Sequence, residues 1–257
     1  MHYKYALVKP PGSSFSQGIT SASLGAPHFS LAVEQHAAYC AALEQCGLSV
    51  IRLPSDDAYP DSTFVEDTAI LTSHRAILTR PGAPSRLGEV QGIRTEITKH
   101  YQHISIIQAP GTLDGGDVCQ AEDHFFIGIS GRTNNSGAEQ LASYLESDGY
   151  SASYVDLQDI PGLLHLKSGI AYLGDERLVL VEELQEMAGF EGFEVIHVDW
   201  EENYAANCVR VNDTILAAEG FPRFADQLAR LGYQVQLVDV SEFQKMDGGL
   251  SCLSLRF

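Results

Sequence analysis

The feature that most constrains the fold of this 257-residue chain is a pattern that recurs five times. Each copy reads as an amphipathic helix, an apolar strand, a polar loop and a second apolar strand. The polar loops carry landmark residues at steps of 48, 51, 42 and 45 residues, namely Glu66, Asp114, His165, Asn207 and Cys252. One unit alone would leave an apolar face uncovered, which favours five units around an axis, strands inside and helices outside. We therefore predict an α/β fold, a five-bladed pseudo-symmetric propeller that closes as a single domain over residues 1–257.

Four of the five predicted helices have a clear apolar face at helical spacing. These faces consist of Val33, Ala37, Cys40 and Leu43; Val90, Ile93 and Ile97; Ala138, Leu141 and Leu145; and Phe224, Leu228 and Leu231. Ser30 is the predicted N-cap of the first helix, and Gly47 follows its end. A weaker pattern predicts the fourth helix near residues 182–190. Because the five loops are equivalent in the repeat, we expect them to converge on one mouth of the ring.

The charge balance narrows the range of partners. Asp and Glu number 34 against 16 Lys and Arg, a formal net charge of −18 that repels phosphate backbones and anionic lipids and favours cationic ligands. No apolar run approaches the ~20 residues of a membrane span, and the N-terminus does not resemble a signal peptide. We therefore expect a cytoplasmic protein that binds neither nucleic acid nor membranes.

The five cysteines are an odd number without a C-x-x-C pair, which indicates neither a disulfide framework nor a zinc site. Cys40, Cys46, Cys119 and Cys208 are interpreted as packing residues. Cys252 is different, because it follows the Gly-Gly pair in the fifth polar loop. A cysteine nucleophile needs a lowered pKa or an adjacent base, and His165 could relay its proton while Asp114 orients the imidazole.

The predicted mouth also contains carboxylates, namely Asp61, Glu66, Asp67 and Asp114. Carboxylates beside a thiol raise its pKa and repel anions, so a cationic substrate fits this set of groups best. A guanidinium presents N–H donors to paired carboxylates and an electrophilic carbon to sulfur. The sequence thus indicates attack by Cys252, expulsion of an amine from the tetrahedral intermediate, and hydrolysis of the resulting covalent thiouronium by water that His165 activates.

Six blocks in order carry a family resemblance. They are FVEDTAILTSHRAILTRPGAPSR, APGTLDGGDV, GRTNNSGAEQL, LHLKSGIAYL, YAANCVRVN and DGGLSCLSLRF. Together they resemble dimethylarginine dimethylaminohydrolases, members of the pentein (guanidine-modifying) superfamily, over nearly the whole chain. The resemblance implies the five-bladed α/β propeller and hydrolysis of Nω-methylated L-arginine to L-citrulline plus methylamine or dimethylamine. It implies no metal and no organic cofactor.

The resemblance also implies roles for individual residues. Cys252 matches the nucleophile, His165 the general acid and base, and Asp114 an acidic position that is Glu in some relatives. The implied substrate-binding residues are Glu66 and Asp67 for the guanidinium, with Asp61 and Phe64 nearby, Arg86 and Arg132 for the α-carboxylate, and Ile19 in a mobile flap. Asp117 is interpreted as a turn residue and Asn207 as structural.

Two other functions stay open at this point. The first is an arginine or other guanidine deiminase with the same nucleophile; such enzymes are similar in fold but carry a helical insertion that this chain lacks. The second is a non-catalytic binding protein, since the fold resembles that of a ribosome-binding translation factor. The negative charge disfavours RNA, and a small guanidino molecule is the predicted partner. The assembly state is left open, with a homodimer as one option.

Overall fold

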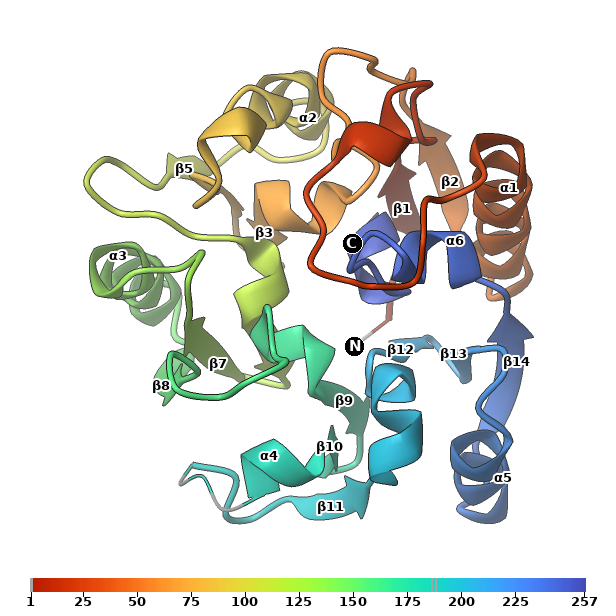
Figure 1. Cartoon of the computed structure of the whole chain (residues 1–257). Helices are drawn as coiled ribbons and strands as arrows, with labels where there is room; N and C mark the ends of the chain where they lie inside the picture. Colours follow the sequence, from red (N-terminus) through yellow and green to blue (C-terminus); the bar gives the residue numbers. More distant parts are fainter. Residues whose placement is uncertain (1, 186, 188) are drawn as a thin grey trace.

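The computed structural model describes residues 2–185, 187 and 189–257, and it arranges five small sheets around a central axis (Figure 1). Each sheet has an inner, a middle and an outer strand. In that order the sheets are β15 (Leu255–Arg256), β1 (Tyr5–Val8) and β2 (Ser49–Arg52); β3 (Ala69–Leu71), β4 (Ala76–Leu78) and β5 (Ile104–Ile106); β6 (Val118–Ala121), β7 (His124–Ile129) and β8 (Ser151–Asp156); β9 (Ile170–Gly174), β10 (Arg177–Leu180) and β11 (Glu194–His197); and β12 (Val209–Val211), β13 (Thr214–Ala218) and β14 (Gln234–Val238). The predicted five-bladed propeller is confirmed.

Helices cover the outside of the ring (Figure 1). They are α1 (Phe29–Gln45), α2 (Glu89–Ile97), α3 (Asn135–Ser147), α4 (Glu182–Gln185) and α5 (Pro222–Arg230), with the short α6 (Ser241–Gln244) nearer the centre. In every blade the middle and outer strands run parallel, and a parallel pair needs a long crossover connection. The sequence supplies it as the helical segment of each repeat. Among the described residues no helix is long and apolar enough to cross a bilayer.

The predicted repeat differs from a blade in two respects. The first is that it has two strands, whereas each observed sheet has three. The second is the grouping of the strands. The two apolar strands that flank each polar loop belong to neighbouring sheets: the loop leaves the outer strand of one blade and enters the inner strand of the next. In four of the blades the inner and middle strands are joined instead by tight antiparallel turns, such as the one at Glu122 with its positive φ of 51°. The polar loops therefore link the blades to one another.

The structure confirms where the predicted helices lie along the chain better than it confirms which of their residues are buried. Helix α1 begins at Phe29 after His28, so Ser30 is not its N-cap, and its predicted face is offset, because Val33 and Ala37 are exposed. The buried face includes Gln35 and His36, which a hydropathy pattern counts as outward-facing. The face prediction also fails at Leu231, which lies beyond α5 and is 37% exposed. The fourth predicted helix is observed only as Glu182–Gln185, and residues 186 and 188 lie outside the described part of the chain.

The two ends of the chain complete one blade. Strand β15 pairs antiparallel with β1, in the register Ala6↔Arg256 and Leu7↔Leu255. The Phe257 carbonyl accepts hydrogen bonds from Lys4 N (2.8 Å) and Tyr5 N (2.7 Å). Because β15 begins three residues after Cys252, the pairing that closes the ring also fixes the segment that carries the predicted nucleophile.

Candidate active site

Each of the five polar loops contains a 3₁₀ turn near its end, just before the next inner strand. These turns are η2 (Val65–Thr68), η4 (Gly115–Asp117), η5 (Leu166–Ser168), η6 (Trp200–Ala206) and η7 (Ser251–Leu253). All five landmark residues lie within these turns or directly beside them. The turns contact one another in the order η7, η2, η4, η5, η6. The loops that the repeat places in equivalent positions thus meet at one end of the ring.

A small pocket of about 30 Å³ lies among these turns. Its lining includes eight of the residues singled out from the sequence, namely Ile19, Asp61, Phe64, Asp67, Arg86, Arg132, His165 and Cys252. It also includes Leu164, Met246, Asp247 and Gly248, which the sequence analysis did not select. Leu164 and Gly248 lie close in sequence to His165 and Cys252, a proximity that could have suggested them. Met246 and Asp247 follow α6; Asp247 opens the DGGLSCLSLRF block, which could have suggested it, whereas Met246 lies outside every quoted block.

His165 is bound to Asp114 behind the pocket wall. Its Nε2 donates a hydrogen bond to Asp114 Oδ2 at 3.1 Å, so the aspartate reaches the imidazole despite its short side chain. Asp114 is fully buried, and its other oxygen accepts from Gly82 N at 2.8 Å. Burial lowers the pKa of His165, but the carboxylates of Asp117, Asp67 and Asp114 outweigh it and raise the pKa to about 9. The imidazole is therefore protonated at neutral pH and can act as an acid.

Asp117 also supports this histidine, although it does not line the pocket. Its Oδ1 accepts from the backbone N–H of Leu166 at 3.0 Å, and its Oδ2 accepts from Ser130 Oγ (2.7 Å) and Thr133 Oγ1 (2.6 Å). Burial raises the pKa of Asp117 to about 6. Asp117 lies within η4, as expected for a turn residue. Its carboxylate also binds the backbone of η5, the next turn along the ring, which His165 directly precedes.

Cys252 is half-buried at the pocket in the first turn of η7. Burial, together with the negative charges of Glu66 and Asp67, raises the pKa of its thiol to about 12. The thiol is consequently protonated in the free protein. A positive charge in the pocket would offset both carboxylates and favour the thiolate, which is the reactive form.

Asp67 faces the pocket and is held from two sides. Its Oδ2 accepts from Arg86 Nη1 at 2.6 Å and its Oδ1 from Gly116 N at 2.8 Å. Burial opposes ionisation, but Arg86 and then His165 keep the pKa of Asp67 below its ordinary value. An ionised carboxylate at this position can accept hydrogen bonds from a guanidinium.

The two predicted arginines differ in how they are used. Arg86 is buried, and besides Asp67 it binds the Glu89 carboxylate (2.8 Å) and the carbonyl oxygens of Asp61 (3.3 Å) and Phe64 (3.1 Å). The guanidinium of Arg132 has no hydrogen-bond or ion-pair partner among the described residues, although it lines the same pocket. Arg132 is therefore the better placed of the two to bind a carboxylate.

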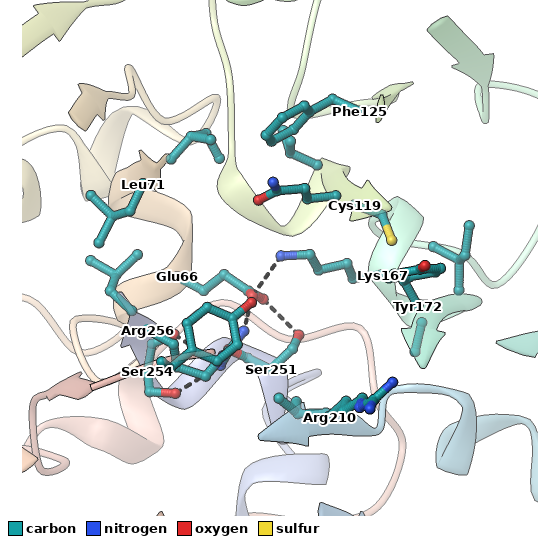
Figure 2. Close-up of a pocket in the computed structure, with 18 of the residues that line it drawn as sticks. Glu66, Leu71, Cys119, Phe125, Lys167, Tyr172, Arg210, Ser251, Ser254 and Arg256 are labelled. Carbon is teal, nitrogen blue, oxygen red and sulfur yellow. Dashed lines mark hydrogen bonds and ion pairs between the residues drawn. The ribbon is translucent and has the colours of Figure 1, made fainter. Parts of the chain in front are cut away.

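Glu66 does not line the small pocket. Its carboxylate accepts from Lys167 Nζ (2.6 Å), Ser251 Oγ (2.6 Å) and Arg256 Nη2 (3.4 Å), as Figure 2 shows. These groups belong to a second, larger space of about 260 Å³, which we call the central cavity because all five inner strands line it. Two cations draw the Glu66 side chain toward this cavity, whereas its neighbour Asp67 faces the pocket.

The segment before α1 crosses the face of the ring close to α6 (Figure 1), and its Ile19 lines the small pocket. Ile19 N donates to Asp61 Oδ1 (3.0 Å), Thr20 Oγ1 to the Lys245 carbonyl (2.9 Å), and Ser21 N to Asp247 Oδ2 (2.5 Å). Ile19 itself is 42% exposed. The segment is thus fastened mainly by hydrogen bonds at exposed or half-buried positions, which suits a part that opens and closes.

Within the described residues one group could hold a metal ion, namely Asp67, Asp114 and His165, whose ligand atoms lie within 4.8 Å of one another. All three are already engaged in hydrogen bonds with the protein, including the one between His165 and Asp114. The same proximity serves proton transfer, because two carboxylates stabilise the charged imidazole.

Comparisons with known proteins agree with this geometry. Residues 56–219 match the model of the arginine deiminase family. The N(G),N(G)-dimethylarginine dimethylaminohydrolase of Pseudomonas aeruginosa is 44% identical over 99% of this chain and all of its own length. The enzyme of the same name from Streptomyces coelicolor is 34% identical over the whole chain and 98% of its own.

Solved structures give the same result. The Pseudomonas aeruginosa enzyme, as a cysteine-to-serine variant in complex with citrulline, superposes with a TM-score of 0.97 and 44% identity over the full length of both chains. A histidine-to-glycine variant of a dimethylarginine dimethylaminohydrolase, an adduct with S-methyl-L-thiocitrulline, has a TM-score of 0.96 over 99% of this chain and all of its own. The N-terminal domain of the cyanobacterial arginine dihydrolase ArgZ, 20% identical, shares the fold with a TM-score of 0.87 over all of this chain and 97% of its own.

Proposed function

The chain belongs to the arginine deiminase family and, within it, to the dimethylarginine dimethylaminohydrolases, and from this premise we propose how its residues carry out the reaction. The enzyme hydrolyses Nω-methylated L-arginine to L-citrulline and methylamine or dimethylamine through a covalent cysteine intermediate. Arginine deimination, with ammonia as the leaving group, is not favoured, because the similarity to dimethylarginine dimethylaminohydrolases runs over the full chain.

The substrate guanidinium lies against Asp67, where its charge offsets the carboxylates that keep Cys252 protonated. The thiol releases its proton to solvent, because His165 is already protonated, and the sulfur forms a bond to the guanidinium carbon. The tetrahedral intermediate expels the methylated nitrogen, which takes a proton from the His165 imidazolium. A positively charged thiouronium remains on Cys252, and His165 is now neutral.

The second half of the reaction uses the same histidine as a base. Neutral His165 takes a proton from water, and the oxygen adds to the thiouronium carbon. The carbon–sulfur bond breaks and its electron pair returns to sulfur, while the hydroxyl proton of the intermediate passes to Cys252 and neutral citrulline leaves. Asp114 holds the imidazole through the 3.1 Å hydrogen bond and stabilises it in each charged stage.

The rest of the substrate occupies the outer part of the pocket. Arg132 binds the α-carboxylate, and Arg86, which is already paired, holds Asp67 and contributes its charge. Phe64 packs against the substrate chain, and Ile19 closes over it from the segment before α1. Glu66 acts on the guanidinium from behind the pocket wall through its charge. The observation that carries this assignment is the convergence of Cys252, His165 and Asp67 on one pocket.

A product assay tests the assignment directly. Citrulline release is measured over a panel of monomethylarginine, dimethylarginine, arginine and shorter guanidino compounds. We expect turnover of the methylated arginines to exceed that of arginine, and a clear preference for arginine would contradict the assignment. Cys252→Ser should lose at least about 10³-fold in kcat, because the nucleophile is gone, while the matched variant Cys46→Ser stays active.

The setting of the enzyme is also a proposal. A single domain over residues 1–257 agrees with the pairing of the two chain ends in one sheet, and a cytoplasmic location agrees with the five free cysteines. For the assembly a homodimer is one option. Cell fractionation and sedimentation of the purified protein test location and assembly separately.

A further inference from the structure

The turn that carries Cys252 is held from behind by Asn207, which does not line the small pocket. Asn207 ends the fourth polar loop and is buried. Its Oδ1 accepts from Ser251 N at 2.9 Å, and its Nδ2 donates to Ser251 Oγ at 3.1 Å and to the Lys167 carbonyl at 2.9 Å. One amide side chain therefore joins the residue directly before the nucleophile to the loop that carries His165.

The Ser251 hydroxyl is fixed from the opposite side by Glu66. Ser251 Oγ donates to Glu66 Oε2 at 2.6 Å, and Lys167 Nζ donates to Glu66 Oε1 at 2.6 Å (Figure 2). Because Lys167 also accepts from Asn207, the contacts form a closed circuit of four residues. We call Glu66, Lys167, Asn207 and Ser251 the clamp. Its members come from four different polar loops, so it connects four blades beside one cysteine.

The Gly-Gly pair before the nucleophile lets the chain sit directly on its supports. A Cβ at Gly249 would lie 2.5 Å from Asn207 Oδ1, and one at Gly248 would lie 2.1 Å from Phe64 Cε1. Such distances are shorter than real carbon contacts, so a side chain at either position would displace the turn or the neighbouring side chain. The main chain of this turn thus contacts Asn207 and Phe64 directly, without an intervening side chain. A change in the Asn207 side chain is therefore expected to shift the turn.

We propose that Asn207 is a positioning residue for the reaction: through the clamp it fixes the backbone of Ser251 and thereby the direction of the Cys252 sulfur. The proposal rests on the proposed function and extends it. Asn207, Lys167 and Ser251 are absent from the lining of the small pocket, so the clamp acts on the nucleophile and leaves substrate contacts unchanged. A fully satisfied buried network is rigid, and misplacement of a reacting atom by about 1 Å can cost about 100-fold in rate.

The first test is Asn207→Ala with Asn203→Ala as its control. Asn203 belongs to the same 3₁₀ segment, but its side chain donates to Glu183 and does not touch the clamp. We expect Asn207→Ala to lower kcat for dimethylarginine by about 10- to 100-fold with KM within about twofold of wild type. Asn203→Ala should keep both constants.

A second readout separates positioning from a general loss of structure. The rate at which a chloroacetamidine reagent alkylates Cys252 should fall with kcat, whereas the Kd for citrulline stays unchanged. A folded Asn207→Ala protein with kcat within twofold of wild type would overturn the proposal, as would a loss that lies entirely in KM.

Ser251→Ala keeps the test decisive if Asn207→Ala does not fold. This variant retains the bond from the Ser251 amide to Asn207 and removes only the hydroxyl contacts, so we expect kcat to fall about tenfold with KM unchanged. Unchanged kcat in that variant refutes the clamp. A wild-type enzyme that turned over no methylarginine would instead refute the proposed function, so the two failures are distinguishable.

Discussion

His165 and Cys252 are held in the protonation states that a cationic substrate requires. Burial together with Glu66 and Asp67 raises the pKa of the thiol to about 12. The carboxylates around His165 overcome its burial and raise the pKa to about 9. The free enzyme therefore holds a thiol beside an imidazolium, and the guanidinium supplies the charge that releases the thiolate. In the proposed reaction the same carboxylates thus keep the free thiol protonated and favour a cationic substrate.

Asp114→Asn tests the charge on His165. Protonated His165 is favoured by folding, so its stabilisation is present below pH 6.5 and is lost as the pH rises through about 9. Wild-type kcat should fall above about pH 9, when the proton for the leaving amine is lost. In Asp114→Asn this fall should begin at lower pH, and kcat should drop about 100-fold. The measurement is kcat as a function of pH, and Asp226→Asn, on the exposed face of α5, is the control. If the fall of kcat at high pH stayed at the same pH in Asp114→Asn, the proposed effect of Asp114 on His165 would be contradicted.

The polar loops show which elements the sequence could predict. Their repeat predicted the landmarks Asp114, His165 and Cys252 near one another, since equivalent positions in a ring share one end. The repeat could not predict that Glu66 would face the central cavity while Asp67 faces the pocket, because this depends on the cations Lys167 and Arg256 from other blades. Met246 was missed for a similar reason: only packing brings the end of α6 to the pocket.

Gly18→Ala tests whether the segment before α1 must pack closely against Asp61 for substrate to bind. Gly18 has φ −64°, which alanine adopts easily, but its Cβ would lie 2.3 Å from Asp61 Oδ1. The clash should displace the segment at a cost of about 1–3 kcal/mol, which corresponds to an about five- to 150-fold rise in KM, with little effect on thermal unfolding. Gly92→Ala, exposed on α2 with only the Lys9 ammonium at 3.6 Å, is the control. Equal KM values for Gly18→Ala and wild type would show that the segment does not contribute to binding.

The ring as a whole is closed by backbone pairing between its two ends. The sequence predicted five blades from its period, and it could not predict which strands share a sheet, since a blade draws its inner strand from the end of one repeat and its other strands from the next. The first blade shows this most clearly, because β15 and β1 come from opposite termini. Closure and catalysis therefore share the short segment after Cys252.

A circular permutation separates closure of the ring from continuity of the chain. Joining the native ends by a short linker and opening the chain between Asp175 and Glu176, a tight turn with both residues at positive φ, should preserve the fold and citrulline release, because the break lies away from the small pocket.

Deleting residues 255–257 removes β15 and its hydrogen bonds to β1, so both the Tm and activity should fall sharply. A truncated protein with unchanged Tm and activity would show that the other four blades hold the Cys252 turn without the closing strand.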